Sequence, residues 1–438
     1  MISPSIQEPF SRIPVIRTVF LLSCVGILFA SSYGLSDAQE WTRFRGPNGT
    51  GLSDAKTIPT AWSEGDYNWK VKLPGVGHCQ PVLFGNKIFL MSGDGEGASR
   101  LLLCLRTEDG DTVWTKSFTA EKHDKHGLNS YASSTPVVDA EKVYVAVVTP
   151  ESQRLLAFSH DGEEKWQREL GPFISRHGCG ASPILFEDKL VFPSEQHGEG
   201  KSFLIALDKN SGKPVWRAER RTESVSYSTP CVFTDSDGRT QLIFNSLAHG
   251  ISSIDPRTGE SNWQAAVFDK RTCSSPVLAG DLVFGTCGSG GGGNFLVAVR
   301  TGGKGEVSET HLAYKIKRAS PYVPTPVVKG ERVYLWGDKG IVSCVVASTG
   351  KVVWRERVGG SYFGSPICVE DRLYCISDRG EVVVVRAADE FKILAKNELG
   401  EGSHNTPAVA GGRMYLRTFS HLISIGGTKP ATGETDVK

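Results

Sequence analysis

The sequence repeats a short unit along most of its length. A Pro that opens a run rich in Val, Ile, Tyr and Phe occurs eight times, at intervals of about 40 to 55 residues. In five of these units a Gly stands four residues before a Trp. Chains that repeat at such a period form solenoids, propellers or arrays, and the β-branched and aromatic residues favour strands. The five pairs are Gly110–Trp114, Gly162–Trp166, Gly212–Trp216, Gly259–Trp263 and Gly350–Trp354.

Each unit predicts four antiparallel strands. Apolar residues alternate on both sides of a turn rich in Gly, Asp, Asn and Lys, as in the hairpin that starts at Pro183. A third apolar run follows, for example residues 203–208, and a turn with Gly then leads to the strand that carries the Trp. Because side chains alternate between the faces of a strand, the fixed Gly-to-Trp spacing places every Trp on the same side of its unit. We expect six indoles to dock between neighbouring sheets: Trp69, Trp114, Trp166, Trp216, Trp263 and Trp354.

The two ends of the repeat region complement each other. The last unit has a hairpin from Pro407 and a third strand over residues 421–427, but no fourth strand. Residues 67–73 resemble a fourth strand that has no earlier partner. An open solenoid would need capping repeats, whereas these halves complete one unit. The sequence therefore predicts an all-β fold over residues 67–427, an eight-bladed β-propeller of four-stranded antiparallel blades, closed by pairing of the N-terminal strand with the last blade.

Two units depart from the pattern without breaking the count. Tyr314 stands at the Trp position after an inserted segment that reads TGGKGEVSET. In a later unit the same position falls within residues 391–394, which contain no Trp. We expect both units to form blades.

The flanking segments carry signals of their own. Two arginines precede an apolar run of twelve over residues 19–30, which is typical of a secretory signal and is shorter than the roughly 20 residues that a membrane-spanning helix needs. We expect a signal peptide over residues 1–38; an uncleaved anchor and lipidation at Cys24 are the alternatives. Residues 39–66 predict an extended arm packed on the ring, and residues 428–438 a disordered tail. The chain is then exported, to the periplasm or the cell envelope.

Charge and cysteine usage exclude some classes of protein. Lys plus Arg total 49 and Asp plus Glu total 48, so the chain lacks the basic excess with which general nucleic-acid binders neutralise phosphates. Of the ten Cys, nine follow the signal segment, and an odd number leaves at least one thiol free or bonded to another chain. No Cys-x-x-Cys occurs, and positions in expected strands favour burial as small hydrophobic side chains.

A nine-residue motif carries a family resemblance. Residues 208–216 read DKNSGKPVW and residues 255–263 read DPRTGESNW. This spacing of Asp, Ser or Thr, Gly and Trp resembles the tryptophan-docking repeat of the pyrroloquinoline-quinone (PQQ)-like β-propeller family, and the segment WTRFRGPNGTG resembles exported bacterial members. The resemblance implies eight four-stranded blades. It also implies either a quinoprotein dehydrogenase with PQQ and Ca²⁺ at the ring axis, or a cofactor-free propeller that docks partners, as in the outer-membrane assembly lipoprotein.

The dehydrogenase branch of this family implies motifs that the chain lacks. Its adjacent Cys-Cys pair and the Cys-x-x-Cys-His of haem-bearing members are absent, and its calcium ligands and catalytic Asp cannot be matched residue by residue. We therefore favour an exported propeller with no catalytic residue and no cofactor, which binds a protein or another ligand through its loop face. A PQQ- and calcium-dependent alcohol or sugar dehydrogenase is the alternative. We also expect a monomer with a protein partner in the cell envelope, no nucleic-acid partner, and membrane contact only through an N-terminal lipid or signal anchor.

The loops that enter the first strand of each unit gather at one face around the axis, where propellers bind ligands. Their polar and aromatic residues predict a binding funnel, although the same groups could instead bond to loop backbone and plug the channel. No metal site is predicted: His78 and His404 belong to adjoining units, but His177 belongs to a unit a quarter turn away, and three ligands must converge within about 2.0–2.1 Å of one ion. The Gly-rich run 287–294 opens no helix, so it predicts a hairpin loop rather than a phosphate site. The candidate ligand-binding residues are His78, Asn129, Tyr131, His177, Tyr227, Arg271, Tyr322, Tyr362 and His404.

Overall fold

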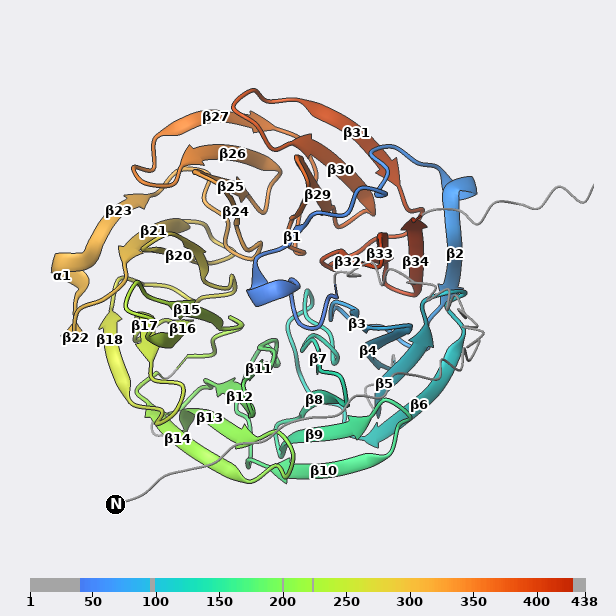
Figure 1. Cartoon of the computed structure of the whole chain (residues 1–438), viewed down its shortest axis with the longest axis horizontal. Helices are drawn as coiled ribbons and strands as arrows, with labels where there is room; N and C mark the ends of the chain where they lie inside the picture. Colours follow the sequence, from blue (N-terminus) through green and yellow to red (C-terminus); the bar gives the residue numbers. More distant parts are fainter. Residues whose placement is uncertain (1–39, 95–98, 199–200, 223, 428–438) are drawn as a thin grey trace, which may run out of the picture. The chain divides into compact units, whose positions relative to one another are not determined.

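The computed structural model describes residues 40–94, 99–198, 201–222 and 224–427. The predicted signal segment with Cys24 and the predicted tail lie outside the described residues. Within them, strands form eight sheets that follow one another around a ring in chain order (Figure 1). The described helical elements are the four-residue α1 (Ser308–His311) and two 3-10 turns, η1 (Pro47–Gly49) and η2 (Glu64–Asp66), so the all-β class is confirmed.

The first four blades follow directly along the chain. Blade 1 contains β3 (Val82–Phe84), β4 (Lys87–Gly93), β5 (Ser99–Arg106) and β6 (Thr112–Thr119). Blade 2 contains β7 (Val137–Val138), β8 (Lys142–Val148), β9 (Gln153–Ser159) and β10 (Glu164–Glu169). Blade 3 contains β11 (Ile184–Phe186), β12 (Lys189–Ser194), β13 (Ser202–Asp208) and β14 (Pro214–Arg220). Blade 4 contains β15 (Cys231–Thr234), β16 (Thr240–Ser246), β17 (Gly250–Ile254) and β18 (Ser261–Ala265).

The remaining blades complete the ring. Blade 5 contains β19 (Val277–Ala279), β20 (Leu282–Cys287), β21 (Phe295–Arg300) and β23 (Leu312–Ile316). Blade 6 contains β24 (Val327–Lys329), β25 (Arg332–Trp336), β26 (Ile341–Val346) and β27 (Val352–Arg357). Blade 7 contains β28 (Ile367–Val369), β29 (Arg372–Ile376), β30 (Glu381–Arg386) and β31 (Ile393–Glu398). Blade 8 contains β32 (Ala408–Ala410), β33 (Arg413–Arg417), β34 (His421–Gly426) and β2 (Tyr67–Lys72).

The ring closes as predicted. The early strand β2 pairs antiparallel with β34, with Trp69 opposite Ser424 and Lys72 opposite His421. Figure 1 shows β2, drawn in blue, as the outermost strand beside the red strands of the last blade. The pairing joins the two ends of the repeat region, so that the first and last parts of the sheet-forming chain hold each other in place.

Two blades carry a fifth strand that the repeat did not predict. In blade 7, β1 (Leu52–Ser53) pairs parallel with β28, and in blade 4, β22 (Gly305–Glu306) pairs parallel with β18. The segment inserted before Tyr314 forms β22 and α1 and thus covers the outer edge of the preceding blade. Four strands per blade therefore hold for the repeat itself, and the additional strands come from the arm and from the insertion.

Each blade changes from a buried centre to an exposed rim. In blade 3 every residue of β12 is buried, whereas the outer strand β14 buries Trp216 and exposes its neighbours Val215 and Arg217. The central strands have neighbouring blades on both faces and are therefore buried, while the outer strands alternate between buried and exposed residues.

The Gly of the motif covers the indole of the preceding blade. Gly212 has a φ of 67°, and a Cβ atom there would lie 2.6 Å from Cε3 of Trp166. Only glycine allows this backbone conformation and this close approach. The indole N–H donates to a carbonyl of the same turn, which ties adjacent blades together. The pairs are Trp69 to Thr107 O, Trp114 to His160 O, Trp166 to Lys209 O, Trp216 to Pro256 O and Trp354 to Ala388 O, at 2.8–3.1 Å.

Trp263 departs from this arrangement. The next blade has the insertion in place of the tight turn, and Trp263 lies opposite Gly305 of β22. Its N–H donates to Oε1 of Gln241 in its own blade at 3.1 Å, and the side chain is 1% exposed. Tyr314 acts in the same seam position one blade later, because its hydroxyl donates to Ala347 O.

Candidate functional site

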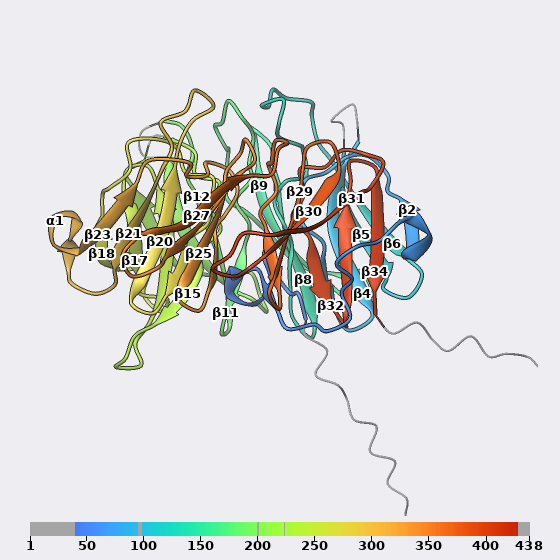
Figure 2. The same ribbon diagram turned by 90° about the horizontal axis from the view of Figure 1, so that it is seen from above.

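The segments before the first strands meet around the ring axis and enclose a cavity of about 1100 Å³. We call the face that they form the loop face. The turn over residues 337–339 and the Gly-rich run 288–294 also reach the cavity. Figure 2 shows the N-terminal arm, in blue, along the opposite face of the ring. The loop face comprises residues 74–80, 120–135, 171–182, 224–229, 266–275, 317–325, 359–365 and 401–406.

The arm closes the axis at the opposite end. The N–H of Leu83 donates to Trp41 O and the N–H of Val138 donates to Thr42 O, each at 2.9 Å, so the arm pairs with first strands of successive blades. Phe44 from the same segment lines the cavity and forms part of its floor. The cavity is therefore a funnel with one open end.

Arg45 fixes the arm at the axis. Its side chain is 0% exposed, and burial lowers the pKa of Arg45 to about 9, so that the guanidinium still carries its charge at neutral pH. The guanidinium is satisfied by five backbone carbonyls. The acceptors are Gly49 O, Thr50 O, Thr325 O, Pro326 O and Pro366 O, at 2.8–3.1 Å.

A belt of hydroxyl groups joins the blades below the funnel. The residue before the Pro of each unit is Ser or Thr in seven of the eight units, and Gln80 in the first. In six units the N–H of this residue donates to the side-chain hydroxyl of the corresponding residue in the next blade; Thr325 N–H, for example, donates to Ser365 Oγ at 3.0 Å. Sequence reasoning missed this belt, although the recurring Ser-Pro and Thr-Pro pairs could have revealed it. The other donors are Gln80, Thr135, Thr229, Ser275 and Ser365, at 2.9–3.0 Å.

One wall of the funnel is basic. Arg271 is half-buried, and its guanidinium makes no hydrogen bond or ion pair with any residue that the structure describes. Lys270, Lys317 and Lys339 line the same cavity from three different loops. We call these four residues the basic wall. Among the lining residues they face a single carboxylate, that of Asp338.

Asp338 is already occupied by backbone. Its two carboxylate oxygens accept the N–H groups of Tyr322 and Val323, at 2.7 and 3.0 Å. Burial raises the pKa of Asp338 against these bonds. The carboxylate therefore holds a loop in place, and among the lining residues the four basic side chains outnumber this one acid.

The opposite wall is aromatic and neutral. The rings of His78 and His404 lie 4.7 Å apart between centroids, and Phe363 lies 4.6 Å from His404. Burial, with the nearby His404 and Arg417, lowers the pKa of His78 to about 3, and burial also lowers the pKa of His404. Both imidazoles are therefore uncharged at neutral pH.

The structure brings together seven of the nine candidate residues. The seven that line the cavity are His78, Asn129, His177, Tyr227, Arg271, Tyr322 and His404. The amide of Asn129 donates to His177 O and Cys179 O, so this residue holds loop backbone, as the plug interpretation proposed.

Tyr131 and Tyr362 do not line the funnel. Tyr362 is 0% exposed and packs edge-on against Trp336, with centroids 5.3 Å apart. Tyr131 lines a second, small pocket, where its ring lies under Arg100 and its hydroxyl donates to His123 O. Their loops were placed correctly, but sequence alone does not set the direction of a side chain within a loop.

The residues that sequence reasoning missed come from turns and from the arm. No sequence pattern distinguishes Lys270, Lys317 and Lys339 from the other lysines of the chain, and Phe44 lies far from the loop face in the sequence. The Gly-rich run, predicted only as a hairpin loop, lines the basic side of the funnel.

The funnel does not offer a metal site in the part of the chain that the structure describes. No group of three or more His, Cys, Asp and Glu side chains comes together among the described residues. Calcium takes six to eight oxygen ligands, whereas the one lining carboxylate is held by backbone. The donor set of the funnel therefore does not fit the calcium of a quinoprotein site. All nine described cysteines are free, and seven are buried.

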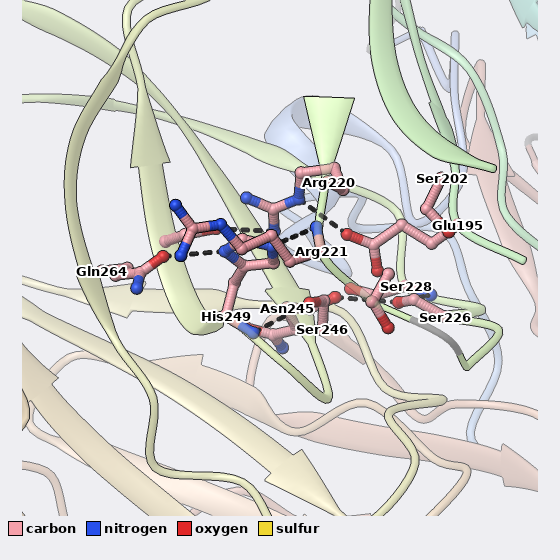
Figure 3. A network of polar contacts seen from close by, with 12 residues as sticks. Glu195, Ser202, Arg220, Arg221, Ser226, Ser228, Asn245, Ser246, His249 and Gln264 are labelled. Atoms are coloured by element: carbon pink, nitrogen blue, oxygen red, sulfur yellow. Dashed lines mark hydrogen bonds and ion pairs between the residues drawn. The ribbon is translucent and has the colours of Figure 1, made fainter. Parts of the chain in front are cut away.

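A buried polar network supports the loop face between blades 3 and 4 (Figure 3). Arg220 donates to Glu195 at 2.8 Å, with side chains 3% and 2% exposed, and also to Ser252 at 3.0 Å. His249 accepts the N–H of Arg221 at Nε2, so its Nδ1 must carry the proton that it shares with Gln264 at 2.7 Å. Burial lowers the pKa of His249 to about 4, consistent with this neutral tautomer.

The structure bears on whether a helix of this chain could span a membrane. Among the described residues, no helix combines the length and the apolar character needed to cross a bilayer.

Comparison with known proteins gives a consistent family. The family described as "Outer membrane protein assembly factor BamB" matches residues 55–286, 174–322 and 303–390, which together run from residue 55 to residue 390. The outer membrane protein assembly factor BamB of Burkholderia pseudomallei (strain K96243) is 23% identical over 340 residues, 75% of this chain and 81% of that protein. The protein of that name from Moranella endobia (strain PCIT) is 22% identical over 291 residues, 64% of this chain and 65% of that protein.

Solved structures share the ring. BamB from Moraxella catarrhalis superposes with a TM-score of 0.55 at 15% identity, over 82% of this chain and 98% of that one. A europium-containing methanol dehydrogenase gives 0.65 at 10% identity, over 89% and 98%. The quinohemoprotein alcohol dehydrogenase from Comamonas testosteroni gives 0.62 at 14% identity, over 90% and 82%. These similarities show the propeller fold alone, because the proteins that share it include both an assembly factor and dehydrogenases.

Proposed function

The chain belongs to the family described as outer membrane protein assembly factor BamB, and from this premise we propose that it is an exported, non-catalytic propeller that docks a protein partner of the cell envelope through its loop face. The curated relatives are named as outer membrane assembly factors. A scaffold of this kind needs a rigid ring and one accessible binding surface, and no reacting group.

The observation that carries the proposal is the asymmetry of the axis. One end is sealed by the arm, whose hydrogen bonds run to the first strands of several blades. The other end is a funnel with a cation, Arg271, that is unpaired among the described residues, and with exposed apolar residues in its loops. Unpaired charge and apolar surface at a concave rim are typical of interaction sites. Those apolar residues are Val76, Leu128 and Ile174, which are 39%, 44% and 48% exposed.

The dehydrogenase alternative has less support from the funnel. Calcium needs several free oxygen ligands, and the carboxylate of Asp338 is held by two backbone N–H groups. The family resemblance alone therefore does not bring PQQ chemistry to this chain, and we propose no cofactor.

Site-specific photocrosslinking tests this function. A benzoylphenylalanine at position 128, where Leu128 lines the cavity, should capture one discrete envelope protein in cells. The same probe in place of Val215, equally exposed at 46% but on the outer strand of blade 3, is the matched control. Equal capture at both positions, or none at position 128, would refute loop-face docking. Stoichiometric uptake of PQQ with Ca²⁺, accompanied by alcohol- or sugar-dependent dye reduction, would instead establish the dehydrogenase.

A further inference from the structure

We propose that the basic wall of the funnel binds an acidic peptide segment, several of whose carboxylates pair with Arg271, Lys270, Lys317 and Lys339. The proposal rests on the docking function and names the chemistry of the partner segment that enters the funnel. It is carried by the charge, the burial and the placement of the four cations.

Arg271 differs from the other arginines of the interior. Arg220 pairs with Glu195, Arg45 donates to five carbonyls, and Arg417 donates to Cys79 O and Met91 O. Arg271 is half-buried, yet its guanidinium has no such partner among the described residues. A partly desolvated guanidinium without a partner is a ready site for a carboxylate, which it can bind through two parallel hydrogen bonds.

The groups around Arg271 suit an anion. Tyr227 and Tyr322 line the cavity close to it; burial raises the pKa values of both phenols, and the charge of Arg271 offsets a smaller part of this rise. Both phenols therefore stay protonated and able to donate at neutral pH. The positive charge of Arg271 also reaches His177, whose pKa is lowered first by burial and then by this charge.

The spread of the cations favours a segment with several acids over a single small anion. Lys270 and Arg271 lie in the loop that enters blade 5, Lys317 in the loop that enters blade 6, and Lys339 in the turn between β25 and β26. Three separate loops thus present charge into one cavity of about 1100 Å³, which exceeds the volume that a single carboxylate or phosphate fills.

The two walls give such a segment an orientation. The neutral aromatic side around His78, His404 and Phe363 offers apolar contact, and the basic wall offers charge. An extended acidic segment with apolar residues between its carboxylates would satisfy both. Lys270 is the member of the wall with a nearby acid, Asp269 at 3.3 Å, whose side chain is 64% exposed.

Titration with a fluorescein-labelled octaglutamate peptide tests the proposal on the full-length protein. We expect octaglutamate to bind with an affinity that falls as NaCl rises from 50 to 300 mM, and octaglutamine not to bind. Arg271→Gln should weaken binding at least about tenfold, and Arg271→Lys should weaken it less. Arg257→Gln, an exposed arginine in the β17–β18 turn of the opposite face, is the matched control and should leave the affinity unchanged.

Each other result contradicts the proposal. Equal binding of octaglutamate and octaglutamine, or equal loss in the two Gln variants, would overturn it. Displacement of octaglutamate by succinate or inorganic phosphate at the peptide's own concentration would show a site for a single small anion instead of a peptide. Thermal unfolding of Arg271→Gln checks that the variant is folded. Photocrosslinking at position 128 separates this proposal from the proposed docking function. If Arg271→Gln keeps both capture and peptide binding, the acidic segment is refuted and docking stands. If the parent protein captures no partner, docking itself is refuted.

Discussion

At one end of the ring axis Arg45 is fully buried and donates to five backbone carbonyls, and at the other end Arg271 is half-buried and donates to none in the part of the chain that the structure describes. The first arginine closes the molecule. The second faces an open cavity of about 1100 Å³ that it shares with three lysines. The same side chain therefore serves stability where its hydrogen bonds are satisfied, and serves binding where they are left for a ligand.

The difference arises from the chain that reaches each end. The arm brings its own backbone to the axis and pairs with β28 and with the first strands of other blades. The loop face has no such segment among the described residues, and its loops present side chains, not a pairing strand, to the axis. A propeller with both ends sealed would be stable but would have no site on its axis.

The largest expected effect is at the sealed end. Arg45→Ala removes a buried charge together with the donors for five carbonyls, and should lower the free energy of unfolding by about 3–5 kcal/mol. Urea unfolding followed by tryptophan fluorescence measures this loss. Arg257→Ala, at an exposed turn, should stay within about 0.5 kcal/mol of the parent. A loss below about 1 kcal/mol for Arg45→Ala would mean that the arm does not hold this end closed.

A pH effect should appear at the open end. The pKa of His78 in the folded chain is about 3, against 6.5 for an ordinary histidine, so between these values the unfolded chain binds a proton that the folded chain does not. Its contribution to stability is complete above about pH 6.5 and is lost as the pH falls toward 3. Between pH 7 and pH 5 we expect a loss of about 1–2 kcal/mol from this residue.

His78→Phe isolates that contribution, because His404, Phe419, Arg417 and Lys125 around it stay in place. Urea unfolding at pH 7 and pH 5 should show a smaller loss in the variant than in the parent. Identical losses in both proteins would show that the aromatic wall does not depend on a neutral His78.

The hydroxyl belt lies between the two ends and should have an intermediate effect. Ser365→Ala removes the acceptor for Thr325 N–H, and should cost about 1 kcal/mol of stability. Ser365→Thr, which keeps the hydroxyl, is the control. Differential scanning calorimetry of both variants measures the effect. Equal melting temperatures for the two would show that the hydroxyl belt does not stabilise the ring.

The smallest stability effect is expected at Arg271. Arg271→Gln removes a cation that has no described partner, so the free energy of unfolding should change by no more than about 0.5 kcal/mol. The same urea unfolding serves here. A loss above about 2 kcal/mol would make Arg271 a structural residue like Arg45 and would erase the contrast between the ends.

The repeat predicted the frame well because its signals are local. Each Gly and Trp, as in Gly212 and Trp216, lies within one turn and one strand, and the physical need for a positive φ and for a covered indole follows from a few residues. The closing pair of β2 and β34 was also predictable, because each half lacks what the other supplies.

The funnel was only partly predictable, because its contacts are long-range. Arg45 reaches carbonyls about 280 to 320 residues away, and no local pattern distinguishes it from a surface arginine. The fifth strand β22 forms by pairing with β18, the outer strand of another blade, and this partner lies beside the inserted segment only in the folded ring. Tyr362 was placed in the right loop but packs on Trp336, since the direction of a loop side chain is set by its neighbours in space.

The most direct test is a crystal structure of the protein with bound octaglutamate peptide. If the open end of the axis is the binding end, the peptide will lie within the funnel, with a carboxylate on the guanidinium of Arg271 and the arm unchanged around Arg45. Peptide density on the arm side or on the outer strands, with the funnel empty, would contradict the account.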